Sequence, residues 1–474
     1  MKVFFDISSL VEYVRRVDRY SGIQRVLSML ISEVSLQISP ENLYLAYVRP
    51  NRKTHQCLRF DEVKSTVLMS PQAMRRLFHP GAVHDDFSPK VLGRYKNSPV
   101  KYYLQRLKLD MFSILGYDKP FCRYHATARN WRKERFSTII PKRSKSVSHS
   151  LLSDVASPGD KLILLDSSWQ KRHSGAFLET RKIGMIVYTL VHDLIPLLAA
   201  STSGANPATF YHWLRDSINY TDHYIANSEA THADLAKFLG IYGKNQPVSV
   251  LPLSQAGLNA VPAEAAPSNG PETGIDRNIF PEVCDMIKVA DHIRALLNTP
   301  YVLCVGTIEA RKNGWRLAAA WKYLVDQGKV DLPRLVFAGR RGWGSNPFDD
   351  LLAGTGNVYG YVSVIESPSD EELEFLYKNC LFLAMPSLYE GWGLPVGEAL
   401  GYGKTALISN STSLPEVGQN YTEYCDPNSI RNIAEAVAKL VDHPERIEEL
   451  ENRIKSGKLR SWSHVAQDLV QIIR

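Results

Sequence analysis

The chain has few cysteines and no long apolar run. No Cys-x-x-Cys pair occurs, which argues against a zinc site or a disulfide framework and favours a reducing compartment. The six cysteines are scattered at Cys57, Cys122, Cys284, Cys304, Cys380 and Cys425. The most apolar segment, IGMIVYTLVHDLIPLLAA, is interrupted by His192, Asp193 and Pro196, so it is a poor candidate for a membrane span.

The N-terminal segment also lacks the pattern of a signal peptide. Its short apolar stretch, MKVFFDISSL, soon reaches Asp6 and carries no small-residue cleavage site. The sequence contains no internal repeat or heptad array. The hydrophobic fraction of 44% is normal for a packed protein and too high for general disorder. These features together predict a soluble, cytoplasmic protein.

Positive charge is concentrated in one part of the chain. Between Lys90 and Lys145 fifteen Lys or Arg residues face three acidic ones, an excess of twelve, whereas the whole chain has a net charge of +7. Aromatic residues are interspersed, as in KYYLQRLKLDMF. We interpret residues from about 87 to 147 as a basic insertion that meets an anionic membrane surface, although a merely solvated insertion is equally compatible. No nucleic-acid-binding motif accompanies it, and no nucleic acid is expected as a partner.

A length of 474 residues predicts two domains. Short apolar segments alternate with segments of helical spacing in both halves, which is typical of α/β folds with parallel sheets. Between them, LSQAGLNAVPAEAAPSNGPETG is rich in Ala, Pro, Gly and Ser. We therefore expect domains at 1–253 and 299–474, joined by a linker at 254–298. Ligands of such folds bind at the carboxyl ends of the strands, in a cleft.

The segment LYEGWGLPVGEAL places two glutamates eight positions apart around a glycine-rich turn. We expect Glu390 at the end of a strand and Glu398 in the first turn of the following helix. Gly391 and Gly393 would leave backbone amides open beside a helix N-terminus, which attracts phosphate. Carboxylates instead accept hydrogen bonds from sugar hydroxyls. Amides and carboxylates in one site are typical of a nucleotide-sugar pocket, although Glu398 alone could simply favour the helix dipole.

This segment resembles the E-x7-E motif of the retaining glycosyltransferases of family 4 (group 1), which have the GT-B fold. The segments VGTIEARKN, FAGRRGWG, HDLIP, ANSEAT and GIQRV extend the similarity in matching order. The resemblance implies two Rossmann-like parallel-sheet domains that face each other across a cleft. Residues 1–253 would bind the acceptor, and residues 299–474 would bind the nucleotide-sugar donor. It also implies that Glu390 contacts the donor sugar and that Glu398 holds the ribose hydroxyls.

Positive charge for a diphosphate is available in VGTIEARKN. Arg311 and Lys312 are predicted to neutralise the leaving group, with Asn313 capping the next helix. Thr307 stands where many relatives have an arginine, so Arg311 is a candidate replacement for it. The chain contains no Asp-x-Asp pair, the usual metal-diphosphate clamp. We therefore expect neither a metal nor a cofactor, and the protein itself would stabilise the diphosphate.

The remaining candidates surround the same cleft. The resemblance implies that His192 lies near the transferred sugar, on the acceptor side, and Asp193 is expected either to orient it or to cap a turn. Gly22 would let the first loop approach the diphosphate. The predicted catalytic residues are thus Glu390, His192, Arg311 and Lys312. The predicted donor-binding residues are Glu398, Gly22, Gly306, Gly339, Arg340, Gly391, Trp392, Gly393 and Leu394.

The segments VGTIEARKN and SLYEGWGLPVGEAL are most similar to bacterial mannosyltransferases that build O-antigen, capsule or exopolysaccharide. The resemblance implies transfer of a hexose, with mannose from GDP-mannose favoured, to a glycan or lipid-linked acceptor. Such work would place the protein in the cytoplasm, peripherally at the inner face of the membrane. Two alternatives stay open: a sugar-nucleotide 2-epimerase of the same fold, and a non-catalytic scaffold of a polysaccharide assembly complex.

Overall fold

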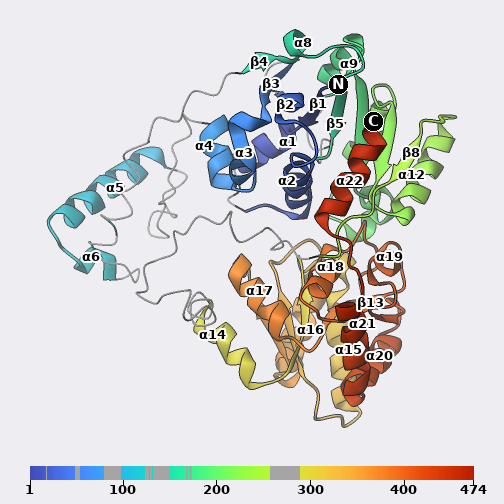
Figure 1. The fold of residues 1–474 in the computed structure, drawn as a ribbon. Coiled ribbons are helices and arrows are strands. Elements are labelled where there is room, and N and C mark those ends of the chain that lie inside the picture. The colour runs from blue at the N-terminus through green and yellow to red at the C-terminus, as the bar shows by residue number, and fades with distance from the viewer. Residues whose placement is uncertain are drawn as a thin grey trace. The chain divides into compact units, whose positions relative to one another are not determined.

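A computed structural model gives the structure of the chain. It describes residues 1–15, 17, 19–48, 54–79, 98–122, 128, 131, 149–166, 169, 173–256 and 289–474. Two compact units are present (Figure 1). The larger unit comprises Met1–Pro71 and Ser150–Arg474, and the smaller one comprises Gln72–His149. Much of the predicted insertion and residues 257–288 of the predicted linker lie outside the described residues.

The first sheet of the larger unit has the strand order β4-β3-β2-β1-β5-β6-β7-β8. Its strands are β1 (Val3–Asp6), β2 (Leu43–Val48), β3 (His55–Arg59), β4 (Ser150–Leu151), β5 (Lys161–Leu164), β6 (Ile186–Val191), β7 (His223–Ala226) and β8 (Val248–Val250). In this spatial order the pairings β2-β1, β1-β5, β5-β6, β6-β7 and β7-β8 are parallel. Strand β3 instead pairs antiparallel with β2 and with β4. The antiparallel pairing of β3 follows from the short connection, because the few residues between Val48 and His55 cannot form the crossover that a parallel strand needs.

Helices cover the faces of this sheet, and its central strands are apolar and buried. The helices are α1 (Ser8–Val14), α2 (Gly22–Val34), α3 (Phe60–Leu68), α8 (Leu152–Val155), α9 (Ser174–Lys182), α10 (Ile195–Leu198), α11 (Pro207–Ser217) and α12 (Glu229–Ile241), with short 3-10 turns at Pro40–Asn42 and Ala200–Thr202. The predicted apolar stripe of α2 is buried from Val26 to Val34, while Ile23 lines a cavity.

The second sheet of the larger unit has the order β11-β10-β9-β12-β13-β14, and all its pairings are parallel. Its strands are β9 (Tyr301–Val305), β10 (Arg334–Ala338), β11 (Val362–Ile365), β12 (Leu383–Met385), β13 (Ala406–Ser409) and β14 (Glu423–Cys425). Strands buried on both faces read as continuous apolar segments such as YVLCV, which is why the sequence predicted most of them.

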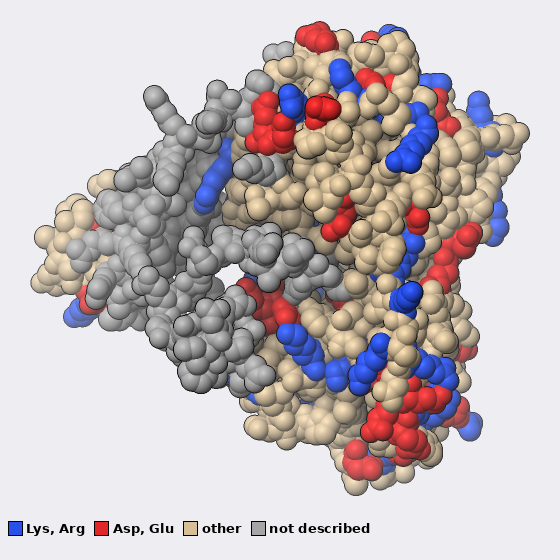
Figure 2. All heavy atoms as spheres, viewed as in Figure 1, with Lys and Arg blue, Asp and Glu red and all other residues tan. Residues whose placement is uncertain are grey.

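Helices and strands of this part together form its core, which includes Trp321 on a helix and Phe337 and Leu407 on strands. The helices are α14 (Asp291–Arg294), α15 (Gly314–Asp326), α16 (Asn346–Tyr359), α17 (Asp370–Asn379), α18 (Leu394–Gly401), α19 (Leu414–Gly418), α20 (Ile430–Asp442), α21 (Pro444–Ser456) and α22 (Trp462–Ile473), with 3-10 turns at Ala295–Asn298 and Ala310–Lys312. On α20 and α21 acidic and basic side chains alternate in ion pairs on the surface (Figure 2).

The last helix returns to the first sheet, because α22 packs on α2. The predicted domain boundaries stay a prediction. Helix α22 follows residue 299 in the chain but contacts the N-terminal helix α2.

The smaller unit contains α5 (Pro99–Ile114) and α6 (Lys119–Cys122), and most of α4 (Pro71–Phe78). Within the described residues no helix is both long and apolar enough to cross a membrane.

Candidate active site

A cavity of about 670 Å³ lies in the larger unit at the carboxyl ends of β6, β9, β10 and β12. The N-terminal end of α2 also borders it. All thirteen residues that the sequence predicted as site residues line this cavity: Gly22, His192, Gly306, Arg311, Lys312, Gly339, Arg340, Glu390, Gly391, Trp392, Gly393, Leu394 and Glu398. The structure thus brings together residues that are up to 376 positions apart in the chain. The catalytic and donor-binding roles assigned to them stay predictions.

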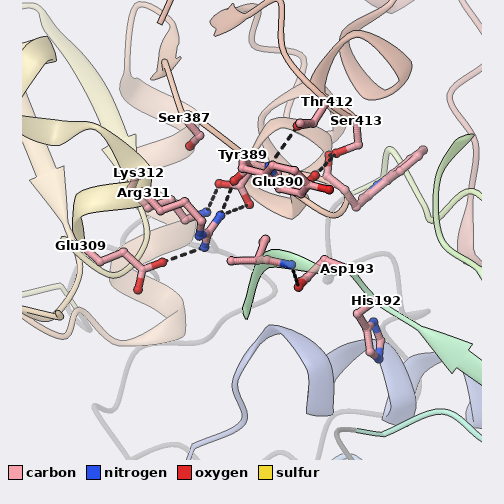
Figure 3. Close-up of polar contacts among 12 residues, drawn as sticks. His192, Asp193, Glu309, Arg311, Lys312, Ser387, Tyr389, Glu390, Thr412 and Ser413 are labelled. Atoms are coloured by element: carbon pink, nitrogen blue, oxygen red, sulfur yellow. Dashed lines mark hydrogen bonds and ion pairs between the residues drawn. The ribbon is translucent and has the colours of Figure 1, made fainter. Parts of the chain in front are cut away.

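Glu390 follows β12 and holds two cations at once (Figure 3). Its Oε2 lies 2.8 Å from Nη1 of Arg311, and its Oε1 lies 2.7 Å from Nζ of Lys312. The carboxylate is 6% exposed. Burial alone would raise the pKa of Glu390, but Arg311 and Lys312 lower it to about 2. Glu390 is therefore ionised at neutral pH and can accept hydrogen bonds, but it cannot act as a general acid.

Arg311 contacts three neighbouring groups of the protein. Nη2 donates to Glu309 at 2.7 Å, and Nη1 donates to the carbonyl oxygen of Tyr389 at 2.6 Å in addition to its ion pair with Glu390. Burial lowers the pKa of this guanidinium, yet the carboxylates of Glu390 and Glu309 more than compensate and raise it above its ordinary value. Arg311 thus fixes the loop before α15 against the loop after β12.

Lys312 and Arg340 have more capacity for a ligand. The ammonium group of Lys312 has three donors, and its ion pair within the described residues is with Glu390. Arg340 lines the cavity, and its guanidinium has no ion pair with any described residue. Two cations on neighbouring strand ends are therefore better placed to contact an anion than Arg311, to which the sequence gave that role together with Lys312.

Asn313 does not cap α15 with its side chain, contrary to the prediction. It adopts a left-handed backbone conformation with φ 62°, and its side chain is completely buried. Nδ2 donates to the carbonyl oxygens of Pro386 and Pro427 at 2.9 and 2.7 Å, and Oδ1 accepts from Arg316. Asn313 therefore ties three loops together, because these carbonyl groups would otherwise be buried without a partner.

Hydrogen bonds with Thr412 and Ser413 hold the loop from Tyr389 to Gly393 in place. The backbone N–H of Glu390 donates to Oγ1 of Thr412 at 3.0 Å, and Oγ of Ser413 donates to the carbonyl oxygens of Glu390 and Trp392 (Figure 3). A Cβ atom on Gly391 would overlap the carbonyl oxygen of His192. Glycine at this position is therefore explained by the close approach of two backbones, and not only by exposed amides as expected from the sequence.

The sequence analysis placed Glu398 in the first turn of the helix, but it lies beyond the first turn of α18. The helix already begins at Leu394, after Gly393 in a left-handed conformation, so Glu398 is one turn further along. Its Oε2 accepts a hydrogen bond of 2.7 Å from the hydroxyl group of Tyr377 on α17. Burial raises the pKa of Glu398, in the opposite direction to Glu390.

Tyr377 is a site residue that the sequence analysis missed. Its ring stacks on Tyr402 with 5.5 Å between centroids, which fixes the hydroxyl group that holds Glu398. Burial raises the pKa of Tyr377, so the phenol remains protonated and donates. The segment DEELEFLYKNC showed only helical spacing, and nothing in it indicated which residue would face a carboxylate twenty-one positions away.

His192 and Asp193 follow β6 and line the same cavity as the charged cluster (Figure 3). Nε2 of His192 lies 2.8 Å from the carbonyl oxygen of Leu165, which can only accept, so Nε2 carries the proton. Burial lowers the pKa of His192, and the imidazole is neutral at neutral pH. Oδ1 of Asp193 accepts from the N–H of Ile195 at 3.0 Å, so Asp193 caps a turn and does not orient His192.

Comparisons with known proteins identify this arrangement. Residues 290–459 match the family model "Glycosyl transferases group 1". This part of the chain is thus similar to group 1 glycosyltransferases. The chain is 33% identical over 165 residues to the O-antigen chain mannosyltransferase B of Escherichia coli, an alignment that covers 35% of this chain and 43% of that protein.

Two further relatives are also mannosyltransferases. Serotype-specific mannosyltransferase WbdA of Escherichia coli is 26% identical over 263 residues, with 54% of this chain and 30% of that protein covered. The MMP alpha-(1->4)-mannosyltransferase of Mycolicibacterium hassiacum is 29% identical over 133 residues, with 27% and 32% covered. The chain thus spans less than half the length of these relatives.

The whole chain resembles a solved structure in its fold. The crystal structure of Anabaena Alr3699/HepE in complex with UDP and glucose superimposes with a TM-score of 0.56 at 10% identity, covering 100% of this chain and 99% of that one. The GT-B fold predicted from the sequence is therefore confirmed.

In chemical terms, the glycosyltransferase domain offers a fixed negative charge between cations, and a second, protonatable carboxylate next to a phenol. No group of three or more His, Cys, Asp or Glu residues suited to a metal ion occurs among the residues that the structure describes. The Glu390 end of the cavity can bind groups with both hydroxyls and negative charge, whereas the Glu398 end can bind neutral hydroxyls.

Proposed function

We propose that this protein is a retaining glycosyltransferase that needs no metal. It transfers a hexose, with mannose from GDP-mannose as the favoured donor, to a glycan or lipid-linked acceptor in the synthesis of a cell-surface polysaccharide. O-antigen is the preferred product class, because two of the relatives described above are named for O-antigen or serotype-specific mannosyl transfer.

The observation that carries this proposal is the contact of one buried carboxylate with two cations in a 670 Å³ cavity. A nucleotide sugar presents hydroxyl groups next to a diphosphate. Glu390 would accept from the sugar hydroxyls, while Lys312 and Arg340 would contact the diphosphate. Glu398 would accept from the ribose hydroxyls through its Oε1, because Oε2 is already bonded to Tyr377.

In the proposed reaction the bond between the anomeric carbon and the leaving phosphate oxygen breaks, and a bond to the acceptor oxygen forms on the same face. The acceptor proton passes to the departing phosphate, so no base from the protein is needed. Lys312 and Arg340 stabilise the negative charge that develops on the diphosphate. Before a donor binds, Glu390 neutralises part of the charge of Lys312, because the two side chains form an ion pair.

Melting of the full-length protein with GDP-mannose, UDP-glucose and GDP tests the proposal. A ligand that binds only the folded protein raises the melting temperature. We expect the largest increase with GDP-mannose, and its loss in Lys312→Ala. Lys182→Ala, an exposed lysine on α9, is the matched control and should respond as the wild type does. No increase with any nucleotide sugar would refute the proposal.

Turnover separates the alternatives. Release of GDP from GDP-mannose that depends on an added mannan or lipid-linked acceptor supports transfer, and it should persist in EDTA. Conversion of the donor to a 2-epimer without an acceptor would instead indicate the epimerase. Nucleotide binding without either reaction would favour the scaffold.

A further inference from the structure

Helix α5 of the smaller unit has two apolar faces. One face is internal: Leu109 is buried in a small cluster with Phe121, Ala128 and Trp131. Nε1 of Trp131 donates to Asp110 at 2.8 Å, which holds the helix to this cluster. The internal face therefore provides the apolar contacts that hold α5 within the smaller unit.

The opposite face is exposed and equally apolar. The α5 stripe consists of Val100, Tyr103, Leu104, Leu107, Met111 and Ile114, whose spacing places them on one face of the helix. Every one of these side chains is between 54% and 71% exposed. With Leu115 and Tyr117 just beyond the helix, this segment contains eight of the twenty exposed large hydrophobic side chains among the described residues. Single exposed apolar residues are ordinary, but a continuous stripe is not.

The surface helix α20 does not share this feature. In α20 the apolar residues at helical spacing, such as Val437 and Leu440, are buried, and its outer face carries charges such as Arg431 and Glu435. In Figure 2 the visible part of α5 is mostly uncharged, whereas the surface of α20 and α21 alternates between charges. The stripe thus departs from the pattern of a soluble helix, which places polar residues on its outer face.

Positive charge borders the stripe. Lys101 and Lys108 are exposed and lie one or three positions from stripe residues, on one flank of the helix. The surrounding sequence from Lys90 to Lys145 has an excess of twelve positive charges. An apolar strip with lysines beside it is complementary to a surface of hydrocarbon covered by phosphate groups. A protein groove would complement the strip but would not require the basic excess.

We infer that α5 lies in the plane of an anionic lipid bilayer, with the α5 stripe inserted below the headgroups and the flanking lysines at the phosphates. The sixteen-residue helix with charged residues on its other faces suits this orientation. The smaller unit thereby acts as a peripheral membrane anchor. This inference does not depend on the identity of the donor, and it gives the basic insertion a defined contact surface.

Flotation of the full-length protein with lipid vesicles tests the inference. We expect binding to vesicles that contain phosphatidylglycerol, weaker binding as salt is raised, and little binding to pure phosphatidylcholine. Leu104→Glu/Leu107→Glu should lower the partition coefficient by about tenfold or more, because it charges the centre of the stripe. Lys101→Glu/Lys108→Glu should lower it several-fold, mainly at low salt.

A matched control changes exposed apolar residues elsewhere. Leu36→Glu/Val330→Glu alters two side chains of the larger unit that are more than 75% exposed, and it should float as the wild type does. A cooperative melting transition at the wild-type temperature would show that each variant is folded. Equal flotation of the stripe variant and the wild type would overturn the inference. So would a wild type that does not bind the vesicles but forms a dimer that the stripe variant cannot form, because the occupant would then be a second copy of the chain.

Discussion

Two glutamates eight positions apart occupy opposite electrostatic environments in one cavity. Glu390 lies between two cations, and its pKa falls to about 2. Glu398 lies next to a phenol, and burial raises its pKa. Burial acts in the same direction on both, so the difference comes from the partners alone. A short sequence motif can therefore contain one permanently ionised carboxylate and one that is held closer to its neutral form.

Replacing Glu390 should have the largest effect on activity. We expect Glu390→Gln to lower turnover on the order of 10²- to 10³-fold, because the contact to the reacting sugar and the position of both cations are lost together. It should also lower the melting temperature, because two nearly buried cations lose their partner. Initial rates and melting curves measure the two effects. Glu309→Gln, which removes only the outer partner of Arg311, should retain most of the activity.

The same comparison predicts how stability depends on pH. The folded pKa of Glu390 lies below the value of 4.5 for an unperturbed glutamate, so its contribution to stability is present above pH 4.5 and is lost as pH falls towards 2. Urea unfolding of wild type and Glu390→Gln between pH 7 and pH 3 checks this. The difference in the free energy of unfolding should shrink as pH falls, and a constant difference would contradict the ion-paired state of Glu390.

Variants of Lys312 and Arg311 distinguish the stabilising ion pairs of Glu390 from the binding of the nucleotide. Lys312→Ala should weaken GDP binding about 10- to 100-fold, because a charge-assisted contact is lost. Arg311→Lys keeps the charge but loses the fork that joins Glu309, Glu390 and the carbonyl oxygen of Tyr389. It should lower stability more than GDP affinity. Calorimetric titration and melting curves measure both, and the reverse ranking would return the diphosphate contact to Arg311.

Changes at the other carboxylate should be smaller and partly of opposite sign. The folded pKa of Glu398 is raised, so its contribution to stability is present at low pH and is lost as pH rises through that pKa. Glu398→Gln, which keeps an acceptor for Tyr377, should therefore raise the melting temperature at pH 7, by about 2 °C, and have no such effect near pH 4.

Tyr377→Phe provides the matched functional test at this end of the cavity. It should raise the KM for the donor several-fold with little change in kcat, because Glu398 loses its orientation while the charged end remains intact. The penalty should disappear with a donor that lacks the ribose 2′- and 3′-hydroxyls. An equal loss with both donors would mean that Tyr377 stabilises the fold but does not position Glu398.

Local sequence patterns predicted the strands and the loop positions well. Buried parallel strands such as β9 are short apolar segments, and the glycine turn after β12 is visible in the order of residues. All thirteen candidate residues meet in one cavity because carboxyl ends of parallel strands share an edge. The antiparallel strand β3 and the loop-tying role of Asn313 escaped prediction, because each depends on a neighbour distant in sequence.

The sequence by itself determined the alternation of strands and helices, the basic insertion and the presence of two glutamates with an Arg-Lys pair. Only the tertiary structure decided which charge meets which partner. Ion pairing and burial depend on distances of a few ångströms between residues far apart in the chain, and these distances set the pKa of Glu390 and Glu398 in opposite directions. The exposed stripe of α5 follows the same rule, since its periodicity is written in the sequence but its outward side is set by the cluster around Trp131.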